Sequence, residues 1–319
     1  MIGVAGAGAF GTALAIAQAQ AGREVLLWAR TAEQAIEMAD SRRNARYLGD
    51  VALPAAISIT SDIGDLAMSD TLLLAMPTQS LRGFLRDHGA RIGHARLIAC
   101  CKGVEMTTLD GPTAIMLAAC PNATPAVLTG PSFAADIARG LPTALTLGCD
   151  RPEAEALQIL LSTPNLRLYR TDDVIGAELG GALKNVVAIG AGIVIGAGLG
   201  DSARAALMTR GFAEMVRLAT ALGGRAETLA GLSGFGDLVL TCTSPQSRNY
   251  RFGLALGQGR AFELAITVEG LATAQAAATL AHRHGLDLPV TQAVADLVTR
   301  KSTLTQAISD LFSRPLKQE

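Results

Sequence analysis

The first half of the chain alternates short apolar runs with segments of helical spacing. Each apolar run is closed by a turn that contains glycine, proline or a polar residue, which is typical of strands. The runs are continuous rather than alternating, so they predict strands covered on both faces, in a parallel sheet with flanking helices. The predicted strands are Ile2–Ala5, Glu24–Trp28, Thr71–Ala75, Leu97–Cys101, Ala126–Thr129, Ala144–Gly148 and Leu166–Arg170.

Beyond about Asp173 the strand patterns end, and segments rich in Ala and Leu with helical spacing replace them. We therefore predict an α/β, Rossmann-like N-terminal domain at residues 1–173 and an all-α C-terminal domain at residues 174–319. The boundary near Thr171–Val174 marks a change of architecture rather than a flexible linker. The predicted helices are Thr12–Ala21 and Thr31–Ala39 in the first domain, and Glu214–Leu222, Ala272–His282 and Val290–Val298 in the second.

A glycine-rich turn joins the first predicted strand to the first predicted helix. Its sequence is Gly6-Ala7-Gly8-Ala9-Phe10-Gly11. In a dinucleotide-binding turn the first glycine permits the tight bend, the second lets backbone approach a pyrophosphate, and the third lets helix and strand pack closely. The helix N-terminus then faces the phosphate charge. Glycines alone also occur in ordinary flexible turns, but the strand before and the helix after favour a cofactor site.

Composition and charge exclude several classes of protein. The 319 residues carry a net charge of −1, which gives no field to attract nucleic acid or anionic lipid. The five cysteines are odd in number and follow neither a disulfide nor a zinc pattern, so we expect no metal site. The uncharged Met1–Gly22 lacks the basic segment of a signal peptide, and Val186–Gly200 is shorter than the roughly 20 residues of a membrane span. We expect a soluble protein.

Lys184 is the only charged residue between Glu178 and Asp201, in a run of Val, Ile, Ala and Gly. Burying an unpaired ammonium costs several kcal/mol, on the order found for real proteins. A buried lysine often has a function, because burial shifts its pKa and makes it a usable proton donor or acceptor. The alternative is a lysine whose charged end reaches the surface from a buried helix. This feature alone leaves both interpretations open.

Further candidates follow the predicted strands, where ligands bind in such sheets. Arg30 stands where an acid would contact the adenosine ribose, and a guanidinium there suits a 2′-phosphate. Lys102 lies directly before a glycine at a strand end. In the second domain three glycines lead to Asp237, and Arg248-Asn249 offers donors for a small phosphate. A surface arginine, a solvated lysine and a helix-capping aspartate are the structural alternatives for these positions.

Together these segments resemble the NAD(P)-dependent glycerol-3-phosphate dehydrogenase family, bacterial type. The similarity runs in order along almost the whole chain. It implies a Rossmann-like domain joined to an all-helical domain, usually in a homodimer. It also implies a cytoplasmic enzyme that interconverts sn-glycerol 3-phosphate and dihydroxyacetone phosphate for phospholipid synthesis. The matching motifs are Gly6-Ala-Gly-Ala-Phe-Gly-Thr-Ala, Lys102-Gly-Val-Glu, Gly130-Pro-Ser-Phe-Ala, Leu179-Gly-Gly-Ala-Leu-Lys-Asn, Thr209-Arg-Gly, and Gly234-Phe-Gly-Asp-Leu with Ser247-Arg-Asn.

The resemblance assigns roles position by position. Lys184 falls on the proton-transfer lysine, and Lys102 on a lysine that touches both cofactor and substrate. The cofactor is NADPH/NADP, with NADH/NAD also plausible, and no metal is implied. The substrate positions are Lys102, Gly130, Ser132, Lys184, Asp237, Ser247, Arg248 and Asn249. The cofactor positions are Gly6, Gly8, Ala9, Phe10, Gly11, Arg30, Lys102, Gly130, Ser132, Ala134, Arg248, Thr267 and Glu269.

The chain departs from the family pattern at a few positions. Ala9 replaces a frequent serine, Gly49 a common proline and Asp136 a usual glutamate, and the stretch before Val268 is shortened next to Thr267. Two other functions share the coarse layout. One is another two-domain Rossmann reductase acting on a hydroxyacid or ketoacid, such as a ketopantoate-type enzyme, which would not need Ser247-Arg-Asn. The other is a non-catalytic NADPH-binding sensor.

Overall fold

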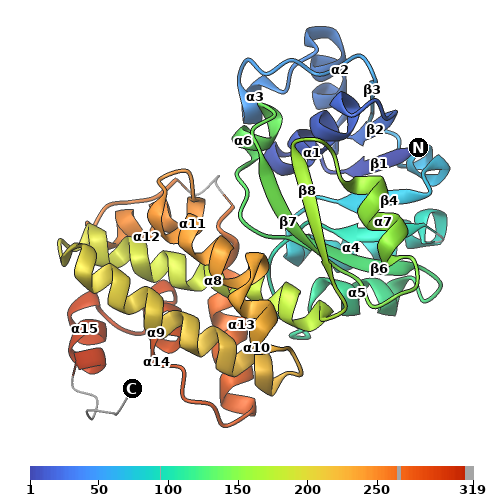
Figure 1. The fold of residues 1–319 in the computed structure, drawn as a ribbon. Coiled ribbons are helices and arrows are strands. Elements are labelled where there is room, and N and C mark those ends of the chain that lie inside the picture. The colour runs from blue at the N-terminus through green and yellow to red at the C-terminus, as the bar shows by residue number, and fades with distance from the viewer. Residues whose placement is uncertain (94, 264–266, 313–319) are drawn as a thin grey trace.

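The computed structural model describes residues 1–93, 95–263 and 267–312. The N-terminal domain is built on an eight-stranded sheet with the order β3-β2-β1-β4-β5-β6-β7-β8 (Figure 1). The strand β1 pairs with both β2 and β4, so the chain reverses its direction of winding there. The strands are β1 (Ile2–Ala5), β2 (Val25–Trp28), β3 (Ile57–Thr60), β4 (Thr71–Leu74), β5 (Arg96–Ala99), β6 (Thr124–Thr129), β7 (Thr143–Gly148) and β8 (Leu166–Thr171).

Helices cover both faces of this sheet. On β4, Leu73 packs into the same cluster as residues of α1 and α7, whereas Leu72 and Leu74 pack into the cluster that holds residues of α4 and α5. Two buried faces explain why the strand sequences are continuously apolar. The elements between the strands are α1 (Ala9–Gln20), α2 (Ala32–Ser41), α3 (Ala45–Leu48), the 3₁₀ helix η1 (Ile63–Met68), α4 (Thr78–Ile92), α5 (Pro112–Ala119), α6 (Ala134–Ala138) and α7 (Ala154–Leu161).

All seven predicted strands are present, but two features differ from the prediction. The additional strand β3, Ile57-Ser58-Ile59-Thr60, lies at the edge of the sheet and alternates apolar and polar residues. It therefore lacks the continuous apolar run on which the prediction of strands rests. The sheet is also not wholly parallel, because β6 and β7 are antiparallel. The connection after β6 holds only the five-residue α6, which packs on α1, and it does not cross back to the opposite edge.

The second domain consists of helices packed around α8 (Figure 1). Each helix predicted from spacing is observed: α9 contains Glu214–Leu222 except its last residue, and α13 and α14 match the other two segments. The elements are α8 (Val174–Gly196), α9 (Gly200–Ala221), α10 (Ala226–Ala230), the π-helix η2 (Leu232–Gly236), α11 (Asp237–Thr243), α12 (Arg248–Gly257), α13 (Glu269–Arg283), α14 (Pro289–Val298) and α15 (Leu304–Phe312).

The central helix α8 is unusually apolar and closely packed. It is the one helix among the described residues that is long and apolar enough to cross a membrane, yet 89% of its most apolar window is buried inside the structure. Its glycines allow close contact with α12, because a Cβ at Gly192 would collide with the carbonyl oxygen of Tyr250. On the facing helix, a Cβ at Gly253 would collide with the carbonyl oxygen of Ile189. The composition of α8 therefore reflects its place in the domain core.

Candidate active site

Two lysines and one aspartate from three elements form a compact charged cluster. Lys184 lies in the middle of α8, Asp237 begins α11, and Lys102 follows β5. The Nζ of Lys184 lies 2.9 Å from Oδ1 of Asp237, and the Nζ of Lys102 lies 2.6 Å from Oδ2 of the same carboxylate. Asp237 is fully buried and Lys184 is 7% exposed. The structure thus brings together three predicted site residues, one from the sheet domain and two from the helical domain.

The cluster sets the protonation of its members. Burial alone would raise the pKa of Asp237, but Lys102 and Lys184 outweigh it and hold this pKa below its ordinary value. Burial lowers the pKa of Lys184 to about 8, an effect that Asp237 opposes and Lys102 reinforces. Burial is the largest of these effects and decides the direction of the shift. A lysine with a pKa near 8 is present in both protonation states close to neutral pH, which suits general acid–base catalysis.

Thr241 is a fourth member of the cluster that the sequence did not reveal. Its Oγ1 accepts a hydrogen bond from Nζ of Lys184 at 2.6 Å and donates one to Oδ1 of Asp237 at 3.1 Å. Thr241 lies four residues after Asp237, so both side chains point from the same face of α11. This four-residue spacing from Asp237 is the one feature of the sequence that could have indicated Thr241 as a site residue. The bonds fix the direction in which the Lys184 amine points.

Lys102 connects the cluster to the turn after β6. Its Nζ also donates to the carbonyl oxygen of Gly130 at 2.9 Å. Gly130 has a φ of +133°, and a Cβ there would lie 3.2 Å from Cα of Leu145, so no other residue fits without strain. Ser132 is half-buried, and its Oγ donates to the same carbonyl oxygen at 3.2 Å. Ala134 is the first residue of α6.

The predicted Ser-Arg-Asn segment forms the start of α12. Ser247 caps the helix, because its Oγ accepts from the backbone N–H of Tyr250. Arg248 is exposed, whereas Asn249 is buried. The Nδ2 of Asn249 donates to Oδ1 of Asn185 at 2.8 Å, and its Oδ1 accepts from the N–H of Gly270 at 2.9 Å. Asn249 therefore ties α12 to α13 and to α8, where its partner Asn185 is the residue after Lys184.

Glu269, the first residue of α13, stands between the two domains. Its Oε2 accepts a hydrogen bond of 3.4 Å from Oγ1 of Thr78, at the start of α4. Burial raises the pKa of Glu269 to about 7, and the positive charge of Arg248 works against this rise. Thr267 is exposed and lies at the edge of the stretch 264–266, which is outside the described residues.

The glycine turn has the features that a dinucleotide pyrophosphate requires. Gly6 has a φ of +119°, and Gly11 has no room for a Cβ, which would collide with the carbonyl oxygen of Gly6. A Cβ at Gly8, in contrast, would meet no atom within 4 Å. Ala9 and Phe10 begin α1, whose first turn holds no acidic side chain. The unpaired N–H groups at this helix start are suited to an anion.

Arg30 lies two residues after the end of β2, which is the neighbour of β1, and its side chain is exposed. It therefore lies at the same edge of the sheet as the glycine turn after β1. Lys102 follows β5 at that edge too, since β1, β2, β4 and β5 are parallel. The candidate cofactor residues and the lysine cluster accordingly share the carboxyl edge of the sheet, as ligand sites do in open α/β sheets.

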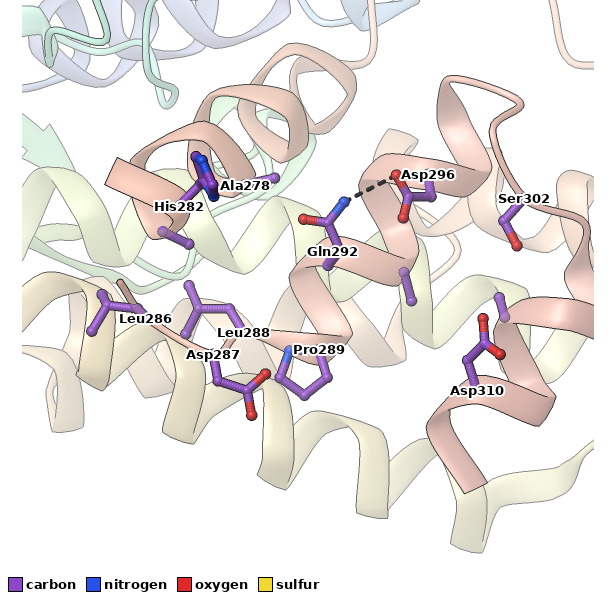
Figure 2. A pocket seen from close by; sticks show the side chains of 13 residues that line it. Ala278, His282, Leu286, Asp287, Leu288, Pro289, Gln292, Asp296, Ser302 and Asp310 are labelled. Atoms are coloured by element: carbon purple, nitrogen blue, oxygen red, sulfur yellow. Dashed lines mark hydrogen bonds between the residues drawn. The ribbon is translucent and has the colours of Figure 1, made fainter. Parts of the chain in front are cut away.

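A separate cavity of about 290 Å³ lies among α13, α14 and α15 (Figure 2). Its lining includes His282, Asp287 and Asp296, and Asp296 is held by a 3.0 Å hydrogen bond from Gln292. None of the predicted site residues line it. Within the described parts of the chain, no group of three or more His, Cys, Asp or Glu side chains is arranged to hold a metal ion.

Comparisons with known proteins converge on one family. Residues 1–155 match the profile described as NAD-dependent glycerol-3-phosphate dehydrogenase N-terminus, and residues 173–309 match the profile of its C-terminus. Two relatives are named glycerol-3-phosphate dehydrogenase [NAD(P)+]. The one from Ruegeria sp. (strain TM1040) is 58% identical over 319 residues, covering 100% of this chain and 99% of its own length. The one from Cereibacter sphaeroides is 60% identical over 322 residues and covers 100% of both chains.

Solved structures agree. A glycerol-3-phosphate dehydrogenase from Coxiella burnetii superposes with a TM-score of 0.93 at 36% identity, covering 98% of each chain. A ketopantoate reductase of the PanE/ApbA family from Ralstonia eutropha superposes with a TM-score of 0.65 at 16% identity, covering 94% of this chain and 98% of that one. At that identity the likeness shows a shared fold alone.

Proposed function

Because this chain belongs to the NAD(P)-dependent glycerol-3-phosphate dehydrogenase family, we propose that the Lys184–Asp237–Lys102 cluster is its catalytic centre. The chain is an oxidoreductase that uses NAD(P) to interconvert sn-glycerol 3-phosphate and dihydroxyacetone phosphate. One observation supports the assignment of the centre: a lysine with a pKa of about 8 is held by a buried aspartate, which also binds Lys102 of the sheet domain. The alternatives of a hydroxyacid reductase or a cofactor-binding sensor have no comparable support.

Lys184 is the residue that moves the proton in this proposal. When bound, the nicotinamide cofactor supplies or takes up the hydride at the substrate carbon. In ketone reduction the protonated Nζ of Lys184 donates a proton to the carbonyl oxygen of dihydroxyacetone phosphate. In the opposite direction the neutral Nζ accepts the proton of the substrate hydroxyl. General acid–base catalysis of this kind contributes roughly 10²–10⁴-fold. Asp237 and Thr241 orient the amine through the hydrogen bonds described above.

The start of α12 is suited to the substrate phosphate. The Arg248 guanidinium is a fork of charged donors, and the first N–H groups of the ten-residue α12 have no partner within the helix. Asn249 keeps one Nδ2 proton beyond its bond to Asn185, and Lys102, a member of the cluster, adds a second cation. Binding of the phosphate here would position the reacting carbon of the substrate, although the phosphate itself does not react.

Several further properties belong to the same proposal. We infer that Arg30 favours NADPH over NADH, because a guanidinium matches a 2′-phosphate. Gly6, Gly8, Ala9, Phe10, Gly11 and Lys102 would hold the cofactor, with Ala134, Thr267 and Glu269 as further contacts. The family resemblance supports a homodimer in the cytoplasm that supplies phospholipid synthesis, with domains divided near residue 173.

An assay of NADPH consumption with dihydroxyacetone phosphate tests the centre. The variant Lys184→Met should lower kcat by roughly 10²-fold or more with a small change in substrate KM, because it removes the proton donor and not the phosphate contacts. The matched control is Lys301→Met, a change of the same side chain at an exposed position after α14. A kcat for Lys184→Met within a few-fold of the wild type would remove Lys184 from the chemistry.

A further inference from the structure

Two side-chain amides hold the central carbonyl group of the glycine turn. The Ala7 oxygen accepts a 2.9 Å hydrogen bond from Nε2 of Gln34 and a 3.0 Å hydrogen bond from Nδ2 of Asn44. The Nδ2 of Asn44 also donates to Oγ1 of Thr12 on α1 at 2.7 Å. Asn44 is only 2% exposed and Thr12 is fully buried. Both amides come from the segment after β2, Gln34 from α2 and Asn44 from the residue before α3 (Figure 1).

The position of this carbonyl decides which way the next N–H points. A trans peptide is planar, so the Ala7 carbonyl and the Gly8 N–H point in opposite directions. With the oxygen held toward Gln34 and Asn44, the Gly8 N–H points away from α2 and α3. Gly8 has open space where a side chain would be and stands at the start of α1. With the Ala7 oxygen bound by the two amides, the Gly8 N–H is thus available as a hydrogen-bond donor to an anion at this turn.

A glycine at position 8 also makes this peptide easy to rotate. Glycine adopts both signs of φ with little penalty, so the covalent chain does not fix the Ala7–Gly8 peptide plane. A rotated plane would place the carbonyl oxygen, with its partial negative charge, on the side where the N–H stood. That arrangement would repel an anion at the N-terminus of α1 instead of binding it. The turn therefore needs an external restraint, and Gln34 and Asn44 are placed to provide it.

We propose that Gln34 and Asn44 are positioning residues for the cofactor pyrophosphate, a role that rests on the proposed dinucleotide site. They act through the Ala7–Gly8 peptide and touch neither the reacting carbon nor the lysine cluster. Gln34 stands four residues after Arg30. The same segment therefore carries the proposed cation for the 2′-phosphate and an amide that positions the Ala7–Gly8 peptide for the pyrophosphate. The segment after β2 thus organises two anion contacts at once.

Cofactor affinity measured without turnover tests this role. Gln34→Met and Asn44→Ala each remove one donor to the Ala7 oxygen, and Asn44→Ala also removes the bond to Thr12. Each variant should raise the Kd for NADPH roughly two- to ten-fold, as expected for one hydrogen bond at that oxygen. The double variant should raise it by more than the product of the two single effects, because either amide alone still holds the carbonyl. Glu37→Met, at an exposed position on the same helix, is the matched control and should leave the Kd unchanged.

A fragment of the cofactor separates positioning from general loosening of the domain. Adenosine 2′-phosphate has no pyrophosphate, so its Kd should stay within about two-fold of the wild-type value in all three variants. A parallel loss of affinity for both ligands, or an unchanged NADPH Kd in the double variant, would overturn the proposal. If Asn44→Ala does not fold, Gln34→Met alone still tests the proposal, because Gln34 is only half-buried. Failure of the wild type to bind NADPH would instead refute the proposed dinucleotide site itself.

Discussion

Replacing Asp237 by Asn should lower the pKa of Lys184 without leaving a cavity in the site. Asn has nearly the same shape, but it removes the negative charge that lies 2.9 Å from Nζ of Lys184. An opposite charge at such a distance typically shifts a pKa by about 1–3 units. The pKa of Lys184, about 8 with Asp237 in place, should therefore fall to about 5–7 in the variant.

The consequence differs between the two directions of the reaction. With a pKa of about 8, roughly 90% of Lys184 is protonated at pH 7, and this fraction falls to roughly 10% at a pKa near 6. Ketone reduction needs the protonated amine, so its rate at pH 7 should fall roughly ten-fold from this cause alone. Alcohol oxidation needs the neutral amine, so its pH profile should move to lower pH, with a loss of rate that reflects the weaker base.

The assay is the pH dependence of kcat/KM in both directions for the wild type and Asp237→Asn. In the wild type, reduction should decline as pH rises through about 8 while oxidation increases. The variant should show both transitions at lower pH. A thermal melt at each pH is needed as a control, because the buried Lys184 and the partly buried Lys102 both lose their carboxylate partner. Breaking a buried ion pair destabilises a fold by about 3–5 kcal/mol. Transitions at the same pH in both proteins would refute the electrostatic argument.

Three more predictions follow from individual contacts. Arg248→Ala should raise the KM for dihydroxyacetone phosphate roughly 10–100-fold, the value of a charged hydrogen bond, and an unchanged KM would exclude Arg248 from the phosphate site. Arg30→Ala should reduce the ratio of kcat/KM for NADPH to that for NADH, and an equal effect on both cofactors would refute a 2′-phosphate contact. Burial raises the pKa of the Glu178 carboxyl, which accepts a 2.7 Å hydrogen bond from the N–H of Thr113, to about 7. The protonated Glu178 carboxyl therefore contributes fully to stability below about pH 4.5, and this contribution is lost as pH rises through 7. The melting temperature of Glu178→Gln, measured against that of the wild type at the same pH, should thus be more favourable at pH 8 than at pH 5.

Much of the fold could be predicted from the sequence because its signals are local. The apolar runs of the central strands, the glycine turn and the loss of strand patterns after Asp173 each depend on a few neighbouring residues. The antiparallel arrangement of β7 could not be predicted, since it depends on where the short α6 packs. The edge strand β3 was missed because half of its side chains are polar.

The candidate site divides in the same way. The isolation of Lys184 among apolar residues is visible in the sequence, and so are the cations that follow the strands. The partners of Lys184 are not, because Thr241 lies 57 positions away and its role depends on how α11 packs against α8. The net direction of the Lys184 pKa shift was also beyond the sequence. It is the balance of burial and two opposing charges, and only the distances decide it.

The salt bridge from Lys102 to Asp237 makes proton chemistry sensitive to how the two halves of the molecule meet. Lys102 is carried by the sheet, whereas the carboxylate and the amine that it influences are carried by helices. If the halves moved apart, Lys184 would no longer be repelled by Lys102, and Asp237 would interact with Lys184 alone. The pKa of Lys184 would then rise. The amine is therefore most ready to release that proton when the halves are together.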